Sequence, residues 1–298
     1  MVSVVIPAFN RADEILYAVW SALDQTLPVG EIIVVDDASL DGTEKIDFAA
    51  IDPRVRLIQH DRNRGGSTAR NTGIDAARFP LIALLDSDDR WLPGKLAAQI
   101  AAIGDRKLTD HFVICSNVTV DRLGKRLLHN RRGPNPGESI ADYLLVARAA
   151  LQTSTLLLPT EFARSVRFRD GLRRCQDLDF VLRLEQAGAE MVYLDEPLTI
   201  YYQRADPGRI TRQPKGFEAT IEWYKVARDL VPARAMQSFF VHSAMGKNWL
   251  HHPGATLKAF LWVAFTSPFG LLRMSWMYMA MIVGRVINKF TPETEYLR

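Results

Sequence analysis

Short runs of β-branched and other apolar residues alternate with segments of helical periodicity through the first ninety residues. The four apolar runs are Val2–Ile6, Glu31–Val35, Val55–Ile58 and Leu81–Leu85. Runs of this length are typical of strands that are buried on both faces of a parallel sheet. The alternation predicts an α/β fold in which helices flank a mostly parallel, Rossmann-like sheet through right-handed crossovers.

Three helices are expected in the segments between these strands. In the first segment, apolar residues recur at helical spacing at Ile15, Leu16, Val19, Trp20 and Leu23. Polar residues that favour the N-cap position precede each helix, so Asn10, Asp41 and Ser67 are the predicted caps. The helices should then end near residues 23, 49 and 77.

Polar residues collect at the points where the four strands end. They are Asn10, Asp36, Asp37, Asp61, Asp86 and Asp88. The carboxyl ends of the strands form the ligand-binding edge of an open α/β sheet. The acidic turn Asp86–Asp89 has an Asp-x-Asp spacing that suits Mg²⁺ or Mn²⁺ held together with substrate phosphates. Taken alone, such a turn is also typical of a helix cap before Pro93.

The pattern of elements becomes mixed after Pro93. Helices are expected over 95–103, 139–150 and 177–187, and strands over 112–117, 118–128, 153–158, 191–194 and 198–202. A change in composition places a domain boundary between Tyr202 and Pro214. The predicted domains are therefore residues 1–211 and a helical, amphipathic C-terminal region at residues 212–298.

The C-terminal region is aromatic, basic and strongly apolar in two segments. These are residues 255–265 and 271–284, interrupted by Lys258, Arg273 and Arg285. Neither segment has the ~18–20 uncharged residues that a membrane-spanning helix needs. We expect amphipathic helices within 255–290 that lie at a membrane surface, with Trp262, Trp276 and Tyr278 at headgroup depth. The alternatives are helices that pack on the catalytic domain or form a homodimer contact.

Composition narrows the class of protein. The net charge of +3 is too small to indicate a nucleic-acid partner. The two cysteines, Cys115 and Cys175, give neither a disulfide framework nor the spacing of metal ligands, which is usual in a reducing cytosol. Val2–Ile6 leads directly into polar residues, unlike a signal peptide. We therefore expect a cytoplasmic protein at the inner face of the cell membrane.

Two other enzyme classes share the alternating pattern of strands and helices. A nicotinamide dehydrogenase should have Gly-x-Gly-x-x-Gly after the first strand, where this chain has Pro-Ala-Phe-Asn-Arg. A nucleotidyltransferase usually has a basic, Gly-rich first loop, which this sequence lacks. Both classes are disfavoured.

Five stretches occur in the order typical of one known family. They are VSVVIPAFNR from Val2, IIVVDDASLDGT from Ile32, GGSTARNTGI from Gly65, LLDSDD from Leu84 and QDLDF from Gln176. Together they resemble the family 2 inverting glycosyltransferases of the GT-A fold. The resemblance covers Met1 to about Thr211 and does not extend to the helical C-terminal region.

The resemblance implies roles for matched positions. Pro7 and Phe9 would line the base pocket, Asp37 would accept a hydrogen bond from the base, and Arg70 would approach the nucleotide or its diphosphate. Asp88 would ligate Mg²⁺ or Mn²⁺, and Asp86 would hold the ribose or assist the metal through water. Asp177 would be the general base.

The sequence departs from the family pattern at two places. The family usually has Glu-Asp where this chain has Gln176 and Asp177, so the charge on the acceptor side is altered. The family often has a His after the last strand of the domain, and the nearest equivalent here is Asp206. From the residues alone, Asp177 could instead cap its helix, and Asp179 competes with it for the role of base.

The predicted activity is metal-dependent, inverting transfer of a sugar from a nucleoside-diphosphate sugar, with a UDP-sugar as the expected donor. The acceptor would be a hydroxyl of a saccharide or lipid-linked saccharide in cell-envelope or exopolysaccharide synthesis. A divalent metal would neutralise the leaving diphosphate, and a carboxylate would take the acceptor proton. The alternative is a catalytically degenerate protein of the same fold that binds nucleotide sugar or acts as a membrane scaffold.

Overall fold

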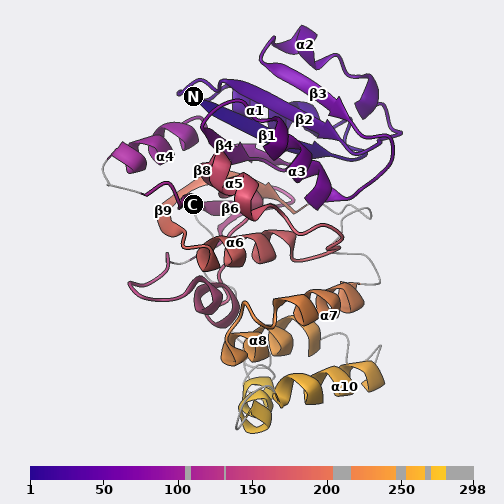
Figure 1. The fold of residues 1–298 in the computed structure, drawn as a ribbon, viewed down its shortest axis with the longest axis vertical. Coiled ribbons are helices and arrows are strands. Elements are labelled where there is room, and N and C mark those ends of the chain that lie inside the picture. Colours follow the sequence, from indigo (N-terminus) through magenta and orange to yellow (C-terminus); the bar gives the residue numbers. More distant parts are fainter. Residues whose placement is uncertain (105–108, 131, 204–215, 246–252, 266–269, 280–298) are drawn as a thin grey trace. The chain divides into compact units, whose positions relative to one another are not determined.

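The chain divides into two compact units. The computed structural model describes residues 1–104, 109–130, 132–203, 216–245, 253–265 and 270–279 (Figure 1). The first unit contains residues 1–133 and 150–205, and the second contains residues 134–149 and 206–298. The boundary predicted after residue 211 lies outside the described residues.

Four parallel strands form one half of the sheet in the first unit. Their bounds are β1 (Val2–Ala8), β2 (Glu31–Asp36), β3 (Val55–Gln59) and β4 (Leu81–Leu84), and their order is β3-β2-β1-β4. The helical elements between them are α1 (Ile15–Leu23), the 3₁₀ turn η1 (Thr43–Lys45), α2 (Phe48–Ile51) and α3 (Gly66–Ala76). The predicted alternation and parallel pairing are confirmed.

The other half of the sheet is mixed. Its strands are β5 (Asp89–Trp91), β6 (Phe112–Arg122), β7 (Lys125–Leu128), β8 (Leu157–Pro159) and β9 (Glu190–Tyr202), and the order continues β4-β8-β6-β9-β5 with β7 on β6. Strand β8 is antiparallel to β4 and β6, whereas β9 is parallel to β6. The helical elements of this half are α4 (Lys95–Gly104), the 3₁₀ turn η3 (Thr153–Thr155), α5 (Thr160–Val166) and α6 (Gln176–Gln186).

Several strand boundaries in this half differ from the prediction. The strands expected over 112–117 and 118–128 are divided differently, because residues 112–122 form one strand, β6. The runs at 191–194 and 198–202 form one strand, β9, because an irregularity in its register with β6 absorbs Asp195 and Glu196. The strand expected over 153–158 starts as the turn η3, and only its last part joins the sheet as β8.

Burial of the parallel strands on both faces explains their continuous apolar sequence. Val4 and Ile6 belong to one core cluster with Ile15 and Val19 of α1. On the opposite face, a Cβ atom added to Gly73 of α3 would lie 2.3 Å from Val5 Cγ1. The glycine therefore lets α3 approach β1 closely, and this contact fixes the position of α3 over the sheet.

The three predicted N-caps are wrong. Asn10 adopts a left-handed conformation with φ 52°, and its Oδ1 accepts from the Leu40 N–H at 2.9 Å. Asp41 accepts from the Ala12 N–H at 2.9 Å and from Thr43, while Asp47 caps α2. Ser67 lies inside α3, which follows Gly65. Asn10 and Asp41 tie loops together at the carboxyl edge, which local sequence preference does not reveal.

The second unit is helical in its described part. It contains the π-helical turn η2 (Asp142–Val146), α7 (Gly216–Ala227), α8 (Ala233–Phe239), the π-helical segment η5 (Phe240–Met245), α10 (Pro253–Ala264) and a helix over residues 270–279. Trp223, Tyr224 and Phe240 are fully buried in it. The helix expected over 139–150 is shortened to η2 and the two residues before it. Among the described residues, none of the helices is long and apolar enough to cross a bilayer.

Candidate active site

Arg70 joins three separate elements at the carboxyl edge of the parallel strands. It lies on α3, and its Nη2 donates to Asp86 Oδ1, just after β4, at 2.5 Å. Its Nη1 donates to Oε1 of Gln176, the first residue of α6, at 2.9 Å. Arg70 is only 9% exposed, so these charged groups interact with little screening by water. Two predicted site residues, Arg70 and Asp86, are thus in direct contact.

Asp177 belongs to the same group of charges. Burial is the main cause that raises the pKa of its carboxyl group, and the negative charge of Asp86 raises it further. The Leu178 N–H and the Arg70 guanidinium oppose the shift. Because the N-cap position of α6 holds Cys175, Asp177 is not the helix cap that local sequence also allowed. A carboxylate with a raised pKa is suited to accept a proton near neutral pH.

Asp179 has a different environment from Asp177. It is fully buried and accepts hydrogen bonds from Arg183 Nε at 2.7 Å and from Arg169 Nε at 3.3 Å. Its charge is therefore compensated by two guanidinium groups inside the fold. This structural role favours Asp177 as the base.

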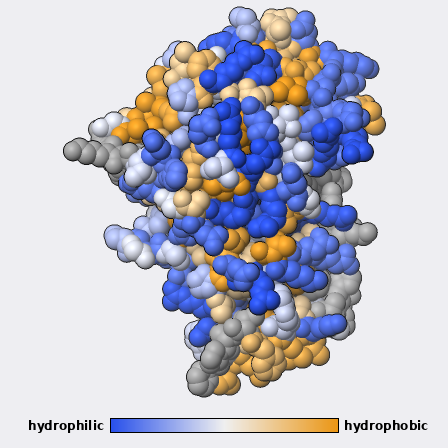
Figure 2. Space-filling model, viewed as in Figure 1, coloured by the Kyte–Doolittle hydropathy of each residue, from blue (hydrophilic) through white to orange (hydrophobic). Residues whose placement is uncertain are grey.

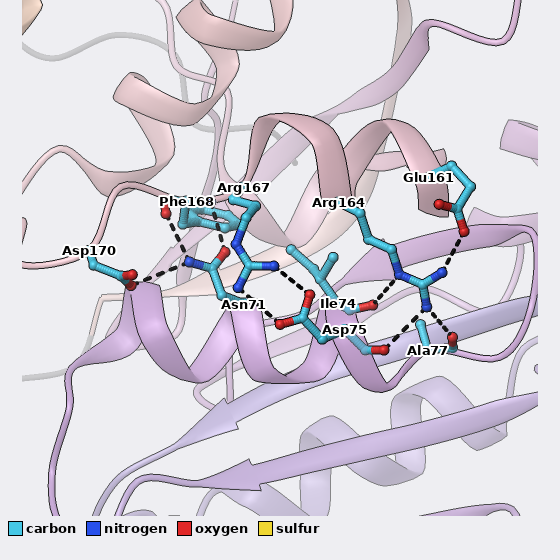
Figure 3. A network of polar contacts seen from close by, with 9 residues as sticks. All are labelled: Asn71, Ile74, Asp75, Ala77, Glu161, Arg164, Arg167, Phe168 and Asp170. Atoms are coloured by element: carbon cyan, nitrogen blue, oxygen red, sulfur yellow. Dashed lines mark hydrogen bonds and ion pairs between the residues drawn. The ribbon is translucent and has the colours of Figure 1, made fainter.

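The segment that leads from α5 into α6 is fastened to α3 by polar contacts (Figure 3). Asn71 Nδ2 donates to the Phe168 carbonyl at 2.8 Å, and Asn71 Oδ1 accepts from the Phe168 N–H at 2.8 Å. Arg167 forms an ion pair with Asp75, and Arg164 donates to three main-chain carbonyls at the end of α3. These contacts fix the start of the segment that carries Asp177.

A buried serine holds the acidic turn after β4. Ser154 Oγ accepts from the Asp86 N–H at 3.0 Å and donates to Asp89 Oδ2 at 2.5 Å. The Ser154 carbonyl accepts from Trp91 Nε1 at 2.7 Å. Trp91 is 3% exposed and is therefore a core residue. Nothing in the local sequence around Ser154 indicated this function.

Asp86 and Asp88 are the two carboxylates available for a divalent metal. Both are half-buried and lie on one turn. Over the ranges that the structure describes, no three His, Cys, Asp or Glu side chains are grouped to bind a metal. Mg²⁺ often uses one or two carboxylates together with phosphate oxygens and water, so the donor types fit such an ion. Asp206, which is nearest to the position where the family often has a His, lies outside the described residues.

Asp37 organises the Gly-rich loop that precedes α3. Its Oδ1 contacts His60 Nδ1 at 2.7 Å and accepts from the Arg64 N–H at 2.8 Å, while Oδ2 accepts from the Gly65 N–H at 2.7 Å. His60 Nε2 lies 3.0 Å from Thr72 Oγ1. Contact of Asp37 with a nucleotide base stays a prediction. The prediction from sequence did not include His60, although it lies only two residues after the third predicted strand.

Pro7 and Phe9 lie beside Asp37. Ala8 pairs with Asp36 in the sheet, and the Asp37 N–H donates to the Ala8 carbonyl at 2.8 Å. The side chain of the next residue, Phe9, is 45% exposed, whereas Pro7 is half-buried within β1. An exposed aromatic ring at this edge offers a surface on which a base could stack.

Cys175 lies at the N-cap position of α6 beside the proposed base. Burial raises the pKa of its thiol to about 12, and the negative charge of Asp177 adds to this. The thiol is therefore protonated at neutral pH and is a poor nucleophile.

Comparison with known proteins shows that the chain is a glycosyltransferase and belongs to glycosyl transferase family 2. The model of that family, "Glycosyl transferase family 2", matches residues 3–150. Over 211 residues the chain is 32% identical to the amylovoran biosynthesis glycosyltransferase AmsB of Erwinia amylovora, covering 67% of this chain and 69% of AmsB.

Two further proteins are similar to this chain. One is the UDP-Glc:alpha-D-GlcNAc-diphosphoundecaprenol beta-1,3-glucosyltransferase WfaP of Escherichia coli, 37% identical over 122 residues, which cover 41% of this chain and 47% of WfaP. The other is the crystal structure of S. aureus TarS 1–349 in complex with UDP-GlcNAc, with a TM-score of 0.70 at 16% identity. It covers 95% of this chain and 92% of TarS 1–349, which confirms the predicted GT-A fold.

Proposed function

We propose that this chain transfers a sugar from a UDP-sugar, with inversion, to a hydroxyl of a lipid-linked saccharide during polysaccharide synthesis. The observation that carries the proposal is the position of Asp177, whose carboxylate lies within electrostatic reach of both Arg70 and Asp86 at the ligand-binding edge of the sheet. Three similar proteins support the substrate classes: AmsB is named for amylovoran, WfaP for UDP-Glc and GlcNAc-diphosphoundecaprenol, and the TarS structure contains UDP-GlcNAc.

The acceptor half of the reaction depends on Asp177. Its carboxylate removes the proton from the acceptor hydroxyl as the oxygen attacks the anomeric carbon, a contribution of ~10²–10⁴-fold. One base, without a second carboxylate as nucleophile, favours a single displacement. A single displacement inverts the configuration of the anomeric carbon.

The donor half depends on residues of the parallel strands and α3. Phe9 would stack on the base and Asp37 would accept its N–H. Asp86 and Asp88 would hold Mg²⁺ or Mn²⁺, which would neutralise negative charge on the leaving diphosphate. Arg70 is bonded to Asp86 beside the proposed metal site, and from there it would approach the nucleotide or its diphosphate.

The second unit is proposed to rest on an anionic membrane surface, at the inner face of the cell membrane. Figure 2 shows apolar colour over the part of the unit that contains α10 and the helix 270–279. Its exposed large side chains are Leu257, Leu261, Trp262, Phe265, Leu271, Leu272, Trp276 and Met279. Residues 230–292 contain no Asp or Glu, so their Lys and Arg charges are suited to anionic lipid headgroups.

Binding to lipid vesicles tests the membrane proposal. We expect the chain to sediment with vesicles rich in anionic lipid and to do so less with neutral vesicles. Trp276→Ser, at a residue 71% exposed, should weaken binding, whereas Trp20→Ser, at a residue 47% exposed in the first unit, should not. Equal binding by both variants would contradict the assignment, and a dimer without vesicle binding would favour a contact between two copies of this chain.

Titration with nucleotides tests the donor site. We expect UDP to bind more tightly than GDP or dTDP and only with Mn²⁺ or Mg²⁺ present. Asp88→Ala should abolish this binding, and Asp177→Ala should leave it intact while transfer is lost. If no nucleoside diphosphate binds under any condition, the donor site is wrong. Binding without transfer to any acceptor would instead support the degenerate scaffold protein.

A further inference from the structure

We propose that Gln176 is a positioning residue whose side-chain amide ties the loop before Asp177 to the donor side of the active site. The inference rests on the proposed function, because it assigns Asp177 to the acceptor and Arg70 to the donor. The inference explains why this chain has Gln176 where the family usually has Glu. A glutamine side chain can donate one hydrogen bond and accept another at the same time, which an ionised glutamate cannot do.

The two ends of the Gln176 amide have different partners. Oε1 accepts from Arg70 Nη1 at 2.9 Å, and Nε2 donates to the Leu172 carbonyl at 2.6 Å. The guanidinium offers only donors and the carbonyl only an acceptor, so the surroundings fix the orientation of the amide. A glutamate would keep the bond to Arg70, but it would turn an acceptor oxygen towards the Leu172 carbonyl.

The hydrogen bonds from Arg70 through Gln176 to Leu172 form a bridge, and the surrounding chain leaves room for it and packs around it. A Cβ atom added to Gly66 would lie 3.0 Å from Arg70 Nη1 and 3.1 Å from Gln176 Oε1. The Phe168 ring centroid lies 5.3 Å from Arg70 Cζ, and the Phe168 ring stacks on Phe180 at 4.0 Å. Phe168 is itself bonded to Asn71 through its main chain (Figure 3). The bridge is therefore held from both sides.

The bridge connects the two halves of the reaction. On the donor side, Arg70 contacts Asp86 with its other terminal nitrogen. On the acceptor side, Leu172 lies in the loop that leads into α6, and Asp177 is the second residue of that helix. A change in that loop would move Asp177 relative to Asp86 while leaving Asp37 and its loop untouched. Gln176 should therefore affect transfer more than nucleotide binding.

The substitution Gln176→Glu tests this inference, because it keeps the shape and removes only the donor. The matched control is Gln186→Glu, which adds the same charge at the exposed end of the same helix. For Gln176→Glu we expect kcat for transfer to fall about 10–100-fold, as for a small misplacement of a catalytic group. Affinity for UDP should change less than about threefold, and the ratio of donor hydrolysis to sugar transfer should rise.

Two further measurements separate positioning from general damage. A double-mutant cycle with Arg70→Ala and Gln176→Ala should show non-additive effects on kcat/KM, since one hydrogen bond joins them. Amide hydrogen exchange in residues 171–175 should increase in Gln176→Glu and not in Gln186→Glu. The inference would be overturned if Gln176→Glu transferred sugar and exchanged its amide hydrogens at the same rates as the wild type. It would also be overturned if the variant lost UDP affinity and transfer rate to the same extent. If the wild-type chain did not bind UDP, the proposed function would be refuted instead. Increased exchange in residues 171–175 of Gln176→Glu would still show that Gln176 holds that loop.

Discussion

His60 Nδ1 lies 2.7 Å from Asp37 Oδ1, and both side chains are almost completely buried. The same carboxylate accepts the main-chain N–H groups of Arg64 and Gly65. The imidazole therefore helps to fix the carboxylate that closes the loop before α3. Since α3 carries Arg70, this pair connects the proposed base pocket with the charged group around Asp86.

His60→Ala should destabilise the chain and weaken nucleotide binding. Removal of the imidazole takes away the contact with Thr72 Oγ1 and leaves Asp37 Oδ1 with only the Arg64 N–H, which costs about 1–3 kcal/mol. The control is His111→Ala, because His111 is exposed. Urea unfolding and calorimetry with UDP would measure the two effects. Equal stability and UDP affinity in both variants would show that the His60–Asp37 contact has little energetic weight.

Asp177→Asn should abolish transfer while it preserves nucleotide binding. The amide cannot take the acceptor proton, so we expect a loss of ~10²–10⁴-fold in kcat. Because burial and Asp86 raise the pKa of the Asp177 carboxyl group, removal of its charge should also stabilise the fold slightly. Transfer assays, UDP calorimetry and urea unfolding would test these three results. A variant that still transfers sugar would assign the base to another residue.

The raised pKa of Asp177 also gives a pH dependence with a definite sign. Transfer should fall as the pH drops through that pKa, which lies above the ordinary value of 3.8 for an Asp. The native chain holds this proton to a higher pH than the unfolded chain. Stability from this group is therefore complete below the ordinary pKa and is lost as the pH rises through the raised one.

A pH series of unfolding measurements isolates the contribution of Asp177. The difference in unfolding free energy, wild type minus Asp177→Asn, should decrease with rising pH across this window. The neighbouring charges of Asp86 and Arg70 are present in both proteins and so largely cancel. A difference that rises with pH would mean that the pKa is lowered, contrary to the expectation from burial.

Ser154→Ala should loosen the acidic turn. The substitution removes the partner of the Asp86 N–H and one partner of the Asp89 carboxylate, both in a buried site. We expect a loss of about 1–3 kcal/mol in stability and a higher Mn²⁺ concentration for half-maximal UDP binding. Ser165→Ala is the control, since Ser165 is exposed and its hydroxyl donates to the Phe162 carbonyl. If the Mn²⁺ concentration needed for UDP binding were unchanged, Ser154 would have no influence on the donor site.

The sequence predicted the elements whose signal is local and continuous. The four parallel strands are buried on both faces, so their apolar runs identify them, and the acidic residues after β2 and β4 follow from the strand ends. The contacts of His60 and Ser154 could not be predicted in this way. Asp89 and Ser154 are 65 residues apart, and their contact depends on β8 joining β4 antiparallel. The pairing of the second half of the sheet has no local signature.

Gly66→Ala should disturb the hydrogen bond between Arg70 and Gln176 without changing either of these two residues. The new methyl group would meet the ends of both side chains at 3.0 and 3.1 Å, closer than most Cβ contacts. Both are flexible tips, so they can move and the fold should survive. We expect a lower kcat for transfer with little change in the unfolding midpoint.

The control is Gly104→Ala at the end of α4, where the added Cβ has open space and alanine favours the helix by up to about 1 kcal/mol. If Gly66→Ala transfers sugar as fast as Gly104→Ala, the site tolerates displacement of the Arg70–Gln176 pair, and the bridge is not needed for catalysis.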